Sequence, residues 1–488
     1  MREFGVSGAK VYVPRLRVDL KRWCDWTDNN WSKTEAVVGR SFRMKAPHES
    51  IYTMAANAVL RLIVDYDIDP AEVGYLALGT ESSTDNSAGA VIVRGMVDQG
   101  LRALGHPTLA RHVEVPELKH ACLGGIYALK SAVRYLAYDG AGRKAIVVCG
   151  DVAEYERGSS GEPTQGAGTV AMLVEERPKL FGLDLDHAGS ASAYRGPDFR
   201  KPFVRHFLER GDGAVAKLHD FPVFSGRYST VCYTEATIRA VEDMLVRLRV
   251  TARNLYHGVG GIFMHRPYRR MPDNAMSSLY IWGLSRSEAH LPELRDLCAG
   301  AGVDSDKVLR EIASRPDLYD HALSGDNGED VFRETMQVVR HFRTTDKFKE
   351  IVSHKMALGS ERMMDLGNLY SAALPVWIAA GFDEAQQRGL DIARQQFLAI
   401  GYGSGDAAEA IPIWAADNWQ AAARRVDIGK ALEGAIDLTR EQYQLLHDEG
   451  RLEGVDYQPS GEFVIDRLGG RKETEFQDLG IEYYSYAP

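Results

Sequence analysis

The chain has 488 residues, of which 45% are hydrophobic and 26% are charged. This length and composition supply enough apolar surface for a large core and for two domain-sized halves, which excludes a disordered chain. The 58 basic and 68 acidic residues give a net charge of -10, so we expect no general attraction to polyphosphate and no nucleic-acid partner.

The N-terminal segment MREFGVSGAKVYVP lacks the charged and then apolar layout of a secretory signal. The longest apolar stretch, Tyr370 to Phe382, contains Pro375 and is too short to span a bilayer. The five cysteines form no CxxC pair and no Cys/His cluster, which is typical of reduced thiols rather than of disulfides or zinc ligands. We therefore expect a cytoplasmic protein with no membrane segment and no metal site.

Two short apolar runs in the first third of the chain, Val73 to Gly79 and Lys144 to Gly150, predict buried strands. The first run ends in the polar turn TESSTDNSAG, as expected of a strand that delivers side chains to a site. Between the runs, Ala121 to Tyr138 has apolar residues near helical spacing, and Gly140 predicts the helix stop. Strand, helix and strand in this order favour an α/β fold with largely buried sheets.

The second half repeats this pattern. Gly260 to Met264 is an apolar run that leads into a histidine, and Gln396 to Ile400 leads into a glycine-rich turn at Gly401 to Gly405. Between these runs, Met271 to Met356 is charged and mostly helical in pattern, which we interpret as an insertion or a lid. From Asp427 onward the sequence predicts helices followed by a strand-like aromatic tail. The shared pattern is consistent with a duplication of one half.

Cys122, in KHACLGG, is expected in the first turn of the predicted helix. Unpaired backbone N–H groups and the positive end of the helix dipole favour a thiolate there, and a thiolate attacks thioesters. The alternative is a small core residue, which is what most free cysteines are. The position at a helix start favours the nucleophile for Cys122, whereas the other four cysteines are interpreted as core residues.

Three further residues have both a structural and a chemical interpretation. Glu81 either caps a local helix or acts as a base, and the sequence alone favours the cap. His265 is either a satisfied core histidine or a general acid–base group. Asn368, in LGNLYSAAL, is either a helix N-cap or a pocket residue.

The glycine-rich segment GYGSG is only superficially a dinucleotide loop, because Asp406 replaces the last glycine of GxGxxG. No GxxxxGK[ST], HExxH or GxSxG occurs, so the sequence gives no support for a P-loop nucleotidase, a zincin or an α/β-hydrolase. The backbone N–H groups of this segment are instead candidates for an oxyanion hole.

Taken together, these segments resemble the hydroxymethylglutaryl-CoA synthase family of the thiolase superfamily along most of the chain. The most specific stretch is Gly161 to Leu173, GEPTQGAGTVAML. The other matching motifs follow the family's order: GTES with Glu81, ELKHACLGG with Cys122, DVAEY ending at Tyr155, SGRYSTVCY with Tyr228, FMHRPYRRM with His265, LGNLYSAAL with Asn368, and YGSG with Ser404. Because so many motifs match in register, the resemblance is more specific than any one of them.

The resemblance implies a thiolase-like five-layer αβαβα fold of two similar halves, normally assembled as a homodimer. Residues 1–178 would form the half that carries Glu81 and Cys122. Residues 179–488 would form the half that carries His265, Asn368 and Ser404, with an insertion at about 272–355. Coenzyme A thioesters would be substrates, and no resident cofactor or metal is implied.

The resemblance also implies catalytic roles. Cys122 would accept acetyl from acetyl-CoA, with its own N–H and that of Ser404 stabilising the oxyanion. Glu81 would remove a proton from the acetyl methyl group. The enolate would then attack the 3-keto carbon of acetoacetyl-CoA, polarised by His265 with help from Asn368, and water would release 3-hydroxy-3-methylglutaryl-CoA.

Further positions match the family's substrate pocket. Tyr155, Thr164 and Ser404 would line it, and Arg269 and Arg270 are candidates for contacting the phosphates of coenzyme A. The family usually has an apolar residue directly after the histidine, where this chain has Arg266. The loop that follows is more cationic, and the stretch from Met271 to Met356 is longer than in compact bacterial members.

These departures fall where the acceptor approaches, so the sequence leaves the acceptor open. One hypothesis is acetoacetyl-CoA, as in mevalonate supply for isoprenoid biosynthesis. The alternative is a β-ketoacyl chain on an acyl carrier protein, as in polyketide β-branching. A third hypothesis, a non-catalytic partner subunit, is disfavoured because the nucleophile, base and polarising positions are all occupied.

Overall fold

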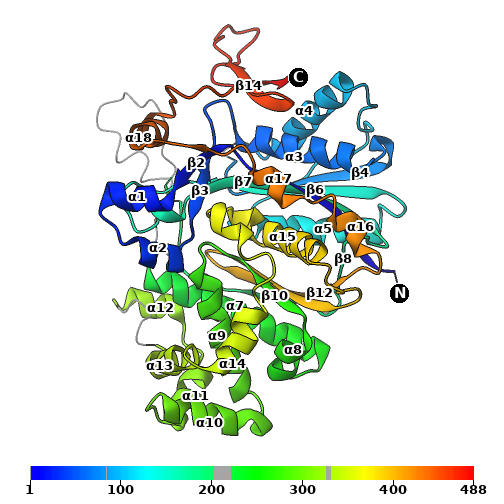
Figure 1. Ribbon diagram of the computed structural model, residues 1–488. Helices are drawn as coiled ribbons and strands as arrows, with labels where there is room; N and C mark the ends of the chain where they lie inside the picture. Colours follow the sequence, from blue (N-terminus) through cyan, green and yellow to red (C-terminus); the bar gives the residue numbers. More distant parts are fainter. Residues whose placement is uncertain (1, 84, 197, 202–220, 224, 326–330) are drawn as a thin grey trace.

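The computed structural model describes residues 2–83, 85–196, 198–201, 221–223, 225–325 and 331–488 (Figure 1). At its centre lies a ten-stranded sheet, in which β9 (Gly189–Ser192) pairs with β12 beside the main path. The main path runs in the order β10 (Gly261–Met264), β11 (Gln396–Gly403), β12 (Ala407–Ala415), β8 (Phe181–Leu183), β1 (Phe4–Tyr12), β7 (Gly166–Glu176), β6 (Lys144–Ala153), β4 (Val73–Gly79) and β5 (Glu117–Leu118).

Both strands predicted in the first third are confirmed. All seven residues of β4 are buried, and β4 pairs in parallel with β6. Continuous apolar runs suit such strands because helices cover both faces of the sheet. Strand β6 continues beyond the predicted Gly150 to Ala153, which places Asp151 inside the strand, next to the carboxyl end of β4.

Helices form three layers that alternate with two parts of the sheet (Figure 1). One outer layer covers β4, β6 and β7, a middle layer separates these strands from β10 to β12, and a second outer layer lies beyond β10 to β12. These layers contain, in turn, α3 (Ile51–Asp65) and α4 (Gly89–Ala103); α5 (Gly124–Ala137) and α15 (Ala373–Gln387); and α7 (Arg227–Leu248), α8 (Ala252–Gly258) and α9 (Arg270–Ser285). In α15 every residue from Ala373 to Phe382 is buried, as expected of a helix enclosed between two sheet parts.

The stretch predicted as a helical insertion is helical in its described part. After α9 it contains α10 (Leu291–Gly300), α11 (Ser305–Ser314), α12 (Leu318–Leu323), α13 (Arg333–Phe342), α14 (Asp346–Phe348) and a π-helical turn at Lys349–His354. Part of the SGDNGED segment, residues 326–330, lies outside the described residues. The role of this stretch as an insertion or a lid stays a prediction.

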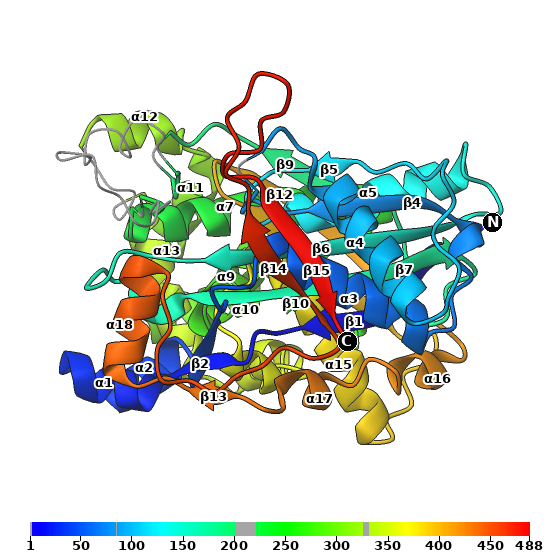
Figure 2. The ribbon, with the colours of Figure 1, turned by 90° about the horizontal axis from the view of Figure 1, so that it is seen from above.

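The helices and the strand-like tail predicted after Asp427 are confirmed. The described elements are α17 (Ile428–Leu432), β13 (Ile436–Asp437), α18 (Arg440–Glu449) and a hairpin of β14 (Glu462–Leu468) and β15 (Glu482–Ala487), and α16 (Trp419–Ala423) precedes them. The hairpin lies over α3 and α4 (Figure 2). The tail of the predicted second half therefore packs on the first half, and the division at residue 178 stays a prediction.

A small three-stranded sheet of β13, β2 (Leu16–Asp19) and β3 (Ser41–Met44) flanks the central sheet. Next to it lie α1 (Leu20–Thr27) and α2 (Trp31–Val37), whose end contributes Val37 to the wall of a cavity at the centre of the molecule. Among the described residues, no helix combines the length and the apolar character needed to cross a lipid bilayer.

Candidate active site

Cys122 lies in a tight turn directly before α5, and its side chain is 7% exposed. The helix begins at Gly124, so the prediction that Cys122 lies within the first helical turn is wrong by two residues. The close approach of this turn to β4 depends on glycine, because a Cβ at Gly79 would lie 2.7 Å from the Cα of Gly125. The glycines after Cys122 thus let the turn pack against the end of the strand that leads to Glu81.

The surroundings of Cys122 do not favour the thiolate that was expected from its position near a helix start. Burial raises the pKa of the Cys122 thiol well above its usual value, and the nearby carboxylates of Glu81, Asp151 and Asp198 raise it further. Desolvation and negative charge both oppose formation of the anion. Burial and the neighbouring acids therefore favour the neutral thiol at Cys122.

Glu81 follows β4 and is the carboxylate that faces the thiol. Its Oε2 lies 3.9 Å from the Sγ of Cys122, and its Oε1 lies 3.9 Å from the Nζ of Lys201. The side chain of Glu81 is buried. The next helix, α4, has Ala88 as its N-cap, so the helix-capping interpretation of Glu81 is wrong.

Asp151 holds the Glu81 loop in place, a role that the sequence did not reveal. Its Oδ1 accepts hydrogen bonds from the N–H of Glu81 at 2.7 Å, from the hydroxyl of Thr80 at 2.7 Å, and from the N–H and hydroxyl of Ser82. Its Oδ2 accepts from the N–H of Ser371 at 2.9 Å and from the Ser371 hydroxyl. Asp151 is fully buried, so one carboxylate fixes the backbone on both sides of the thiol.

His265 directly follows β10, as predicted, and is 2% exposed. The backbone N–H of His265 donates to the carbonyl of Ile400 at 2.8 Å, and the backbone carbonyl of His265 accepts from the hydroxyl of Tyr233 at 2.7 Å. These two hydrogen bonds fix the backbone of His265 between β11 and α7. Burial lowers the pKa of the imidazole to about 3. His265 is therefore neutral at physiological pH and acts as a hydrogen-bonding group rather than as a cation.

The side chain of Asn368 makes two hydrogen bonds, one to a neighbouring tyrosine side chain and one within a local turn. Its Nδ2 donates to the hydroxyl of Tyr155 at 3.4 Å, and its Oδ1 accepts from the N–H of Tyr370 at 3.0 Å. The backbone N–H of Asn368 donates to the carbonyl of Thr164 at 3.1 Å. The side chain thus closes a local turn and lines the cavity beside Tyr155. The N-cap interpretation is wrong, because Leu369 caps the short helical turn Tyr370–Ala372 and Ala372 caps α15.

Cys122, His265 and Asn368 line a cavity of about 200 Å³ between the two parts of the sheet, whereas Glu81 and Asp151 lie behind Cys122 and are not among the lining residues. Six of the nine predicted site residues line it: Cys122, Tyr155, Thr164, His265, Asn368 and Ser404. Arg269 lines a small adjoining hollow that shares Val38, Thr164, Pro267 and Tyr268 with the cavity. Arg270 lines neither space and forms the first residue of α9. The structure therefore brings together residues that lie more than 280 positions apart, from Cys122 to Ser404.

The prediction of a glycine turn at Gly401 to Gly405 is partly wrong. Strand β11 continues through Gly403, and only Ser404 to Asp406 turn toward β12. Gly403 is required by close packing, because a Cβ there would lie 2.6 Å from the carbonyl oxygen of His120. This approach of β11 to the Cys122 turn places Ser404 on the cavity wall.

Comparison with known proteins shows which proteins the chain resembles. Residues 1–178 match the family model described as hydroxymethylglutaryl-coenzyme A synthase N terminal. Over 438 residues, and 88% of each chain, the sequence is 27% identical to a hydroxymethylglutaryl-CoA synthase of Haloferax volcanii. The chain is thus similar to hydroxymethylglutaryl-CoA synthases over most of its length.

Solved structures related to the hydroxymethylglutaryl-CoA synthase family show the same fold. A structure of MvaS in complex with 3-hydroxy-3-methylglutaryl coenzyme A matches 100% of both chains with a TM-score of 0.77 and 24% identity. A synthase of the curacin biosynthetic pathway in complex with an acetyl donor carrier protein covers 99% of this chain and 100% of its own, with a TM-score of 0.69 and 18% identity. The thiolase-like fold predicted from the sequence is thereby confirmed.

Arg266, the departure from the usual synthase pattern, does not reach the cavity of Cys122. Its side chain is buried and donates to the carbonyl and hydroxyl of Ser360, and its guanidinium lies 5.2 Å from the ring centre of Trp377. Burial lowers the pKa of Arg266 to about 10. Arg266 nevertheless lines the adjoining hollow together with Arg269, so the interpretation that it adds charge where the acceptor approaches stays a prediction.

The sequence analysis missed several residues that line or border the cavity. Asp198 lines the cavity and accepts from the hydroxyl of Tyr402 at 2.6 Å. Phe199 packs its ring edge-on against Tyr155 and Tyr370, at 5.9 Å from each ring centre. Their segment, GPDF, has no periodicity and no recognised motif, so only the fold could bring it to the site.

Asp198, Cys232 and Asp406 place one possible ligand atom each within 4.8 Å of one another. The guanidinium of Arg195 already supplies a positive charge there, with its Nε 3.4 Å from Oδ2 of Asp406. Burial nevertheless raises the pKa of Asp406 to about 7. A metal cation would have to compete with Arg195, and the expectation that the site uses no metal stays a prediction.

Proposed function

We propose that this chain condenses acetyl-CoA with acetoacetyl-CoA and water to form 3-hydroxy-3-methylglutaryl-CoA and CoA through an acetyl-Cys122 intermediate. The observation that carries the proposal is the 3.9 Å separation between the Sγ of Cys122 and Oε2 of Glu81, beside a cavity also lined by His265 and Asn368. A nucleophile on the cavity wall, a base in contact with it and a polarising group on the same wall are what a Claisen-type condensation requires.

The first step is acetyl transfer to Cys122. The sulfur attacks the thioester carbonyl of acetyl-CoA, the bond from that carbonyl to the CoA sulfur breaks, and the thiol proton leaves with CoA. The tetrahedral oxyanion would be bound by the backbone N–H groups of Cys122 and Ser404. A neutral resting thiol keeps the desolvated site free of an extra negative charge until the thioester arrives.

The second step forms the carbon–carbon bond. Glu81 removes a proton from the methyl group of acetyl-Cys122, and the enolate carbon attacks the 3-keto carbon of acetoacetyl-CoA. His265 donates an N–H hydrogen bond to the keto oxygen, with Asn368 beside it. Because His265 is neutral, it polarises the keto group as an uncharged hydrogen-bond donor. The keto oxygen becomes the 3-hydroxyl of the product after protonation.

The last step is hydrolysis of the thioester at Cys122. Water adds to the carbonyl, the carbon–sulfur bond breaks, and 3-hydroxy-3-methylglutaryl-CoA leaves while the thiol is restored. Tyr155, Thr164 and Ser404 would line the path of the substrates. Arg269 and Arg270 would lie toward the phosphates of coenzyme A, and the position of Arg269 beside the cavity supports this assignment for that residue.

We further propose a cytoplasmic homodimer that supplies mevalonate for isoprenoid biosynthesis and uses no resident cofactor. The five buried free thiols are in keeping with a reducing compartment. The alternative acceptor, a β-ketoacyl chain on an acyl carrier protein, remains a distinct hypothesis. The curacin pathway synthase was solved in complex with an acetyl donor carrier protein, and that observation concerns the curacin protein alone.

One experiment separates the two acceptors. The protein is incubated with acetyl-CoA and either acetoacetyl-CoA or acetoacetyl-charged acyl carrier protein, and products are followed by thiol release and mass spectrometry. We expect 3-hydroxy-3-methylglutaryl-CoA and free CoA from the first pair. Acetylation of Cys122 followed by condensation only on the carrier protein would contradict the proposed acceptor.

A further inference from the structure

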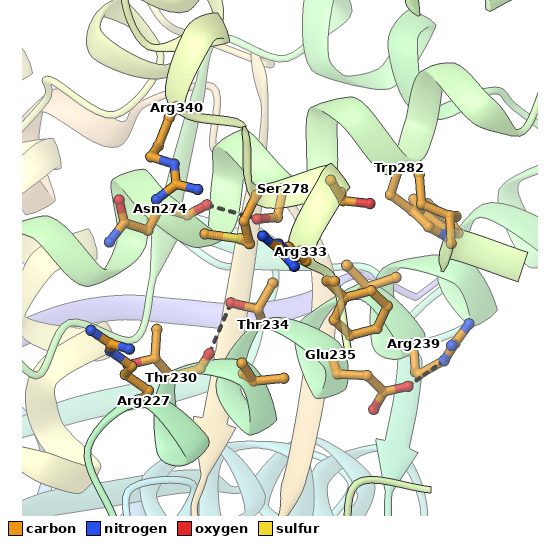
Figure 3. A pocket seen from close by; sticks show the side chains of 16 residues that line it. Arg227, Thr230, Thr234, Glu235, Arg239, Asn274, Ser278, Trp282, Arg333 and Arg340 are labelled. Atoms are coloured by element: carbon orange, nitrogen blue, oxygen red, sulfur yellow. Dashed lines mark hydrogen bonds and ion pairs between the residues drawn. The ribbon is translucent and has the colours of Figure 1, made fainter. Parts of the chain in front are cut away.

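A second cavity, of about 620 Å³, lies between α7, α9, α11 and α13 and shares no lining residue with the cavity of Cys122 (Figure 3). The two cavities use different sides of the same two helices. On α7, Ser229 lines the catalytic cavity and Thr230 lines the second one; on α9, Met271 lines the first and Asn274 the second. The volume lies within the range of about 300–1,000 Å³ that is usual for small-molecule sites.

The walls of the second cavity are largely apolar. Trp282 is 5% exposed and forms one side, whereas Met336 is 37% exposed and lies toward solvent. The apolar lining residues are Val231, Ile238, Trp282, Ile312, Phe332 and Met336. A hollow with this lining favours an apolar body, because filling it removes apolar surface from water.

The charged groups of the second cavity are mostly cationic. Its lining includes four arginines (Arg227, Arg239, Arg333 and Arg340) and a single carboxylate, Glu235. Glu235 is already neutralised, because Arg195 and Arg239 each donate to it at 2.6 Å. The remaining field at the cavity is therefore positive.

Two of these arginines are available to a ligand. In the part of the chain that the structure describes, the side chains of Arg333 and Arg340 make no hydrogen bond or ion pair with the protein, although their backbone belongs to helix α13. In Figure 3, Arg227 and Arg340 lie on one side of the cavity and Trp282 on the other, with Arg333 between them. The cavity thus has a cationic side and an aromatic side, and guanidinium groups bind carboxylates and phosphates by paired hydrogen bonds.

We propose that this second cavity binds a small organic anion with an apolar body, an alkyl or acyl chain that ends in a carboxylate or phosphate. The anionic head pairs with Arg333 and Arg340, and the chain lies against Trp282 and Ile238. A neutral chain would leave the guanidinium groups unused, and an anion without a chain would leave the apolar walls exposed to water.

The proposal is tested by isothermal titration calorimetry on the full chain with four probes used below their micelle-forming concentrations. Decyl phosphate and decanoate carry both features, pyrophosphate has only charge, and decanol has only the chain. We expect one molecule of decyl phosphate or decanoate bound per chain, and weaker binding of the other two probes by about tenfold or more, a difference of about 1.4 kcal/mol. Binding by either charged amphiphile supports the site.

Variants locate the bound probe. The double substitution Arg333→Gln with Arg340→Gln should weaken binding of decyl phosphate by about tenfold or more, because charge-assisted hydrogen bonds are lost. Both arginines are exposed, so folding should be retained. Thr234→Phe fills the cavity and should abolish binding, whereas Thr234→Val and the exposed control Arg102→Gln should leave it unchanged.

Four results would overturn the proposal: no binding of either amphiphile, equal binding of pyrophosphate or decanol, binding unaffected by both the arginine pair and Thr234→Phe, or displacement of decyl phosphate by acetoacetyl-CoA. The last result would place the amphiphile in the catalytic cavity. These outcomes do not depend on whether the condensation reaction occurs.

Discussion

The carboxylate of Asp151 accepts the backbone N–H of Glu81 at 2.7 Å, so the proposed base is positioned by a second, fully buried acid. The same carboxylate binds Ser371 on the opposite side, and these three residues come from separate segments of the chain. The carboxylate of Asp151 is surrounded by hydrogen-bond donors, whereas that of Glu81 faces the thiol. One acid therefore organises the site, and the other lies against the nucleophile.

Asp151→Ala should lower both stability and turnover. Removing the carboxylate leaves the donors of Thr80, Glu81, Ser82 and Ser371 without their buried acceptor, and we expect a loss of about 3 kcal/mol in the free energy of unfolding. Displacement of the base by about 1 Å should lower kcat by about 100-fold. Urea titration and steady-state kinetics measure the two effects. A variant with unchanged kcat would contradict the positioning role, and Asp186→Ala, an exposed change, is the control.

Glu81→Ala should separate the two chemical steps. Acetyl-Cys122 should still form, because attack on acetyl-CoA does not require this carboxylate, but condensation should slow by about 100-fold or more without the general base. Rapid-quench analysis of the acetyl-enzyme and of product gives both rates. Normal turnover by this variant would refute the assigned base, and the exposed Glu288→Gln substitution serves as the comparison.

The reactivity of Cys122 should keep rising at high pH. Burial and the neighbouring carboxylates raise its pKa, so the thiol stays protonated well into the alkaline range, and the rate of alkylation by iodoacetamide should climb about tenfold per pH unit. Glu81→Gln removes one of the negative charges and should lower the pKa, which increases the rate at a given pH. A plateau below pH 8 in the wild-type protein would be inconsistent with a raised pKa.

His265 should make the fold sensitive to mild acid. The folded pKa is about 3 against the ordinary value of 6.5, so below pH 6.5 the unfolded chain takes up a proton that the folded chain does not. The contribution of the neutral imidazole to stability is therefore present above pH 6.5 and is lost as pH falls toward 3. Between pH 7.5 and 5.5 the wild type should lose about 1.4 kcal/mol more than His265→Gln in urea titrations. Equal losses would show that His265 is not buried in its neutral form.

Runs of apolar residues in the sequence correctly predicted the strands that lead to two of the site residues. The buried run Val73 to Gly79 correctly placed Glu81 at a strand end, and the run before His265 did the same for the histidine. Such runs are readable because a strand buried on both faces needs continuous apolar residues. The convergence of these strand ends with Cys122 came from the family resemblance and not from the residues themselves.

Other features depend on contacts that no local pattern encodes. Asp151 meets Glu81 across 70 residues and Ser371 across 220. The glycines at Gly401 and Gly403 suggested a turn, yet they serve the close packing of a strand against Leu123 and His120. The raised pKa of Cys122 likewise follows from burial and three acids, of which the sequence placed only Glu81 near the thiol.

The most direct test is mass spectrometry of the protein after exposure to acetyl-CoA, followed by addition of acetoacetyl-CoA. The account predicts one acetyl group on the peptide that contains Cys122, its loss when acetoacetyl-CoA is added, and the matching appearance of 3-hydroxy-3-methylglutaryl-CoA. Cys122→Ala should show no adduct, whereas Cys298→Ala, which alters a buried cysteine in α10, should behave as the wild type. An unmodified Cys122 peptide, or product formation by Cys122→Ala, would contradict the account.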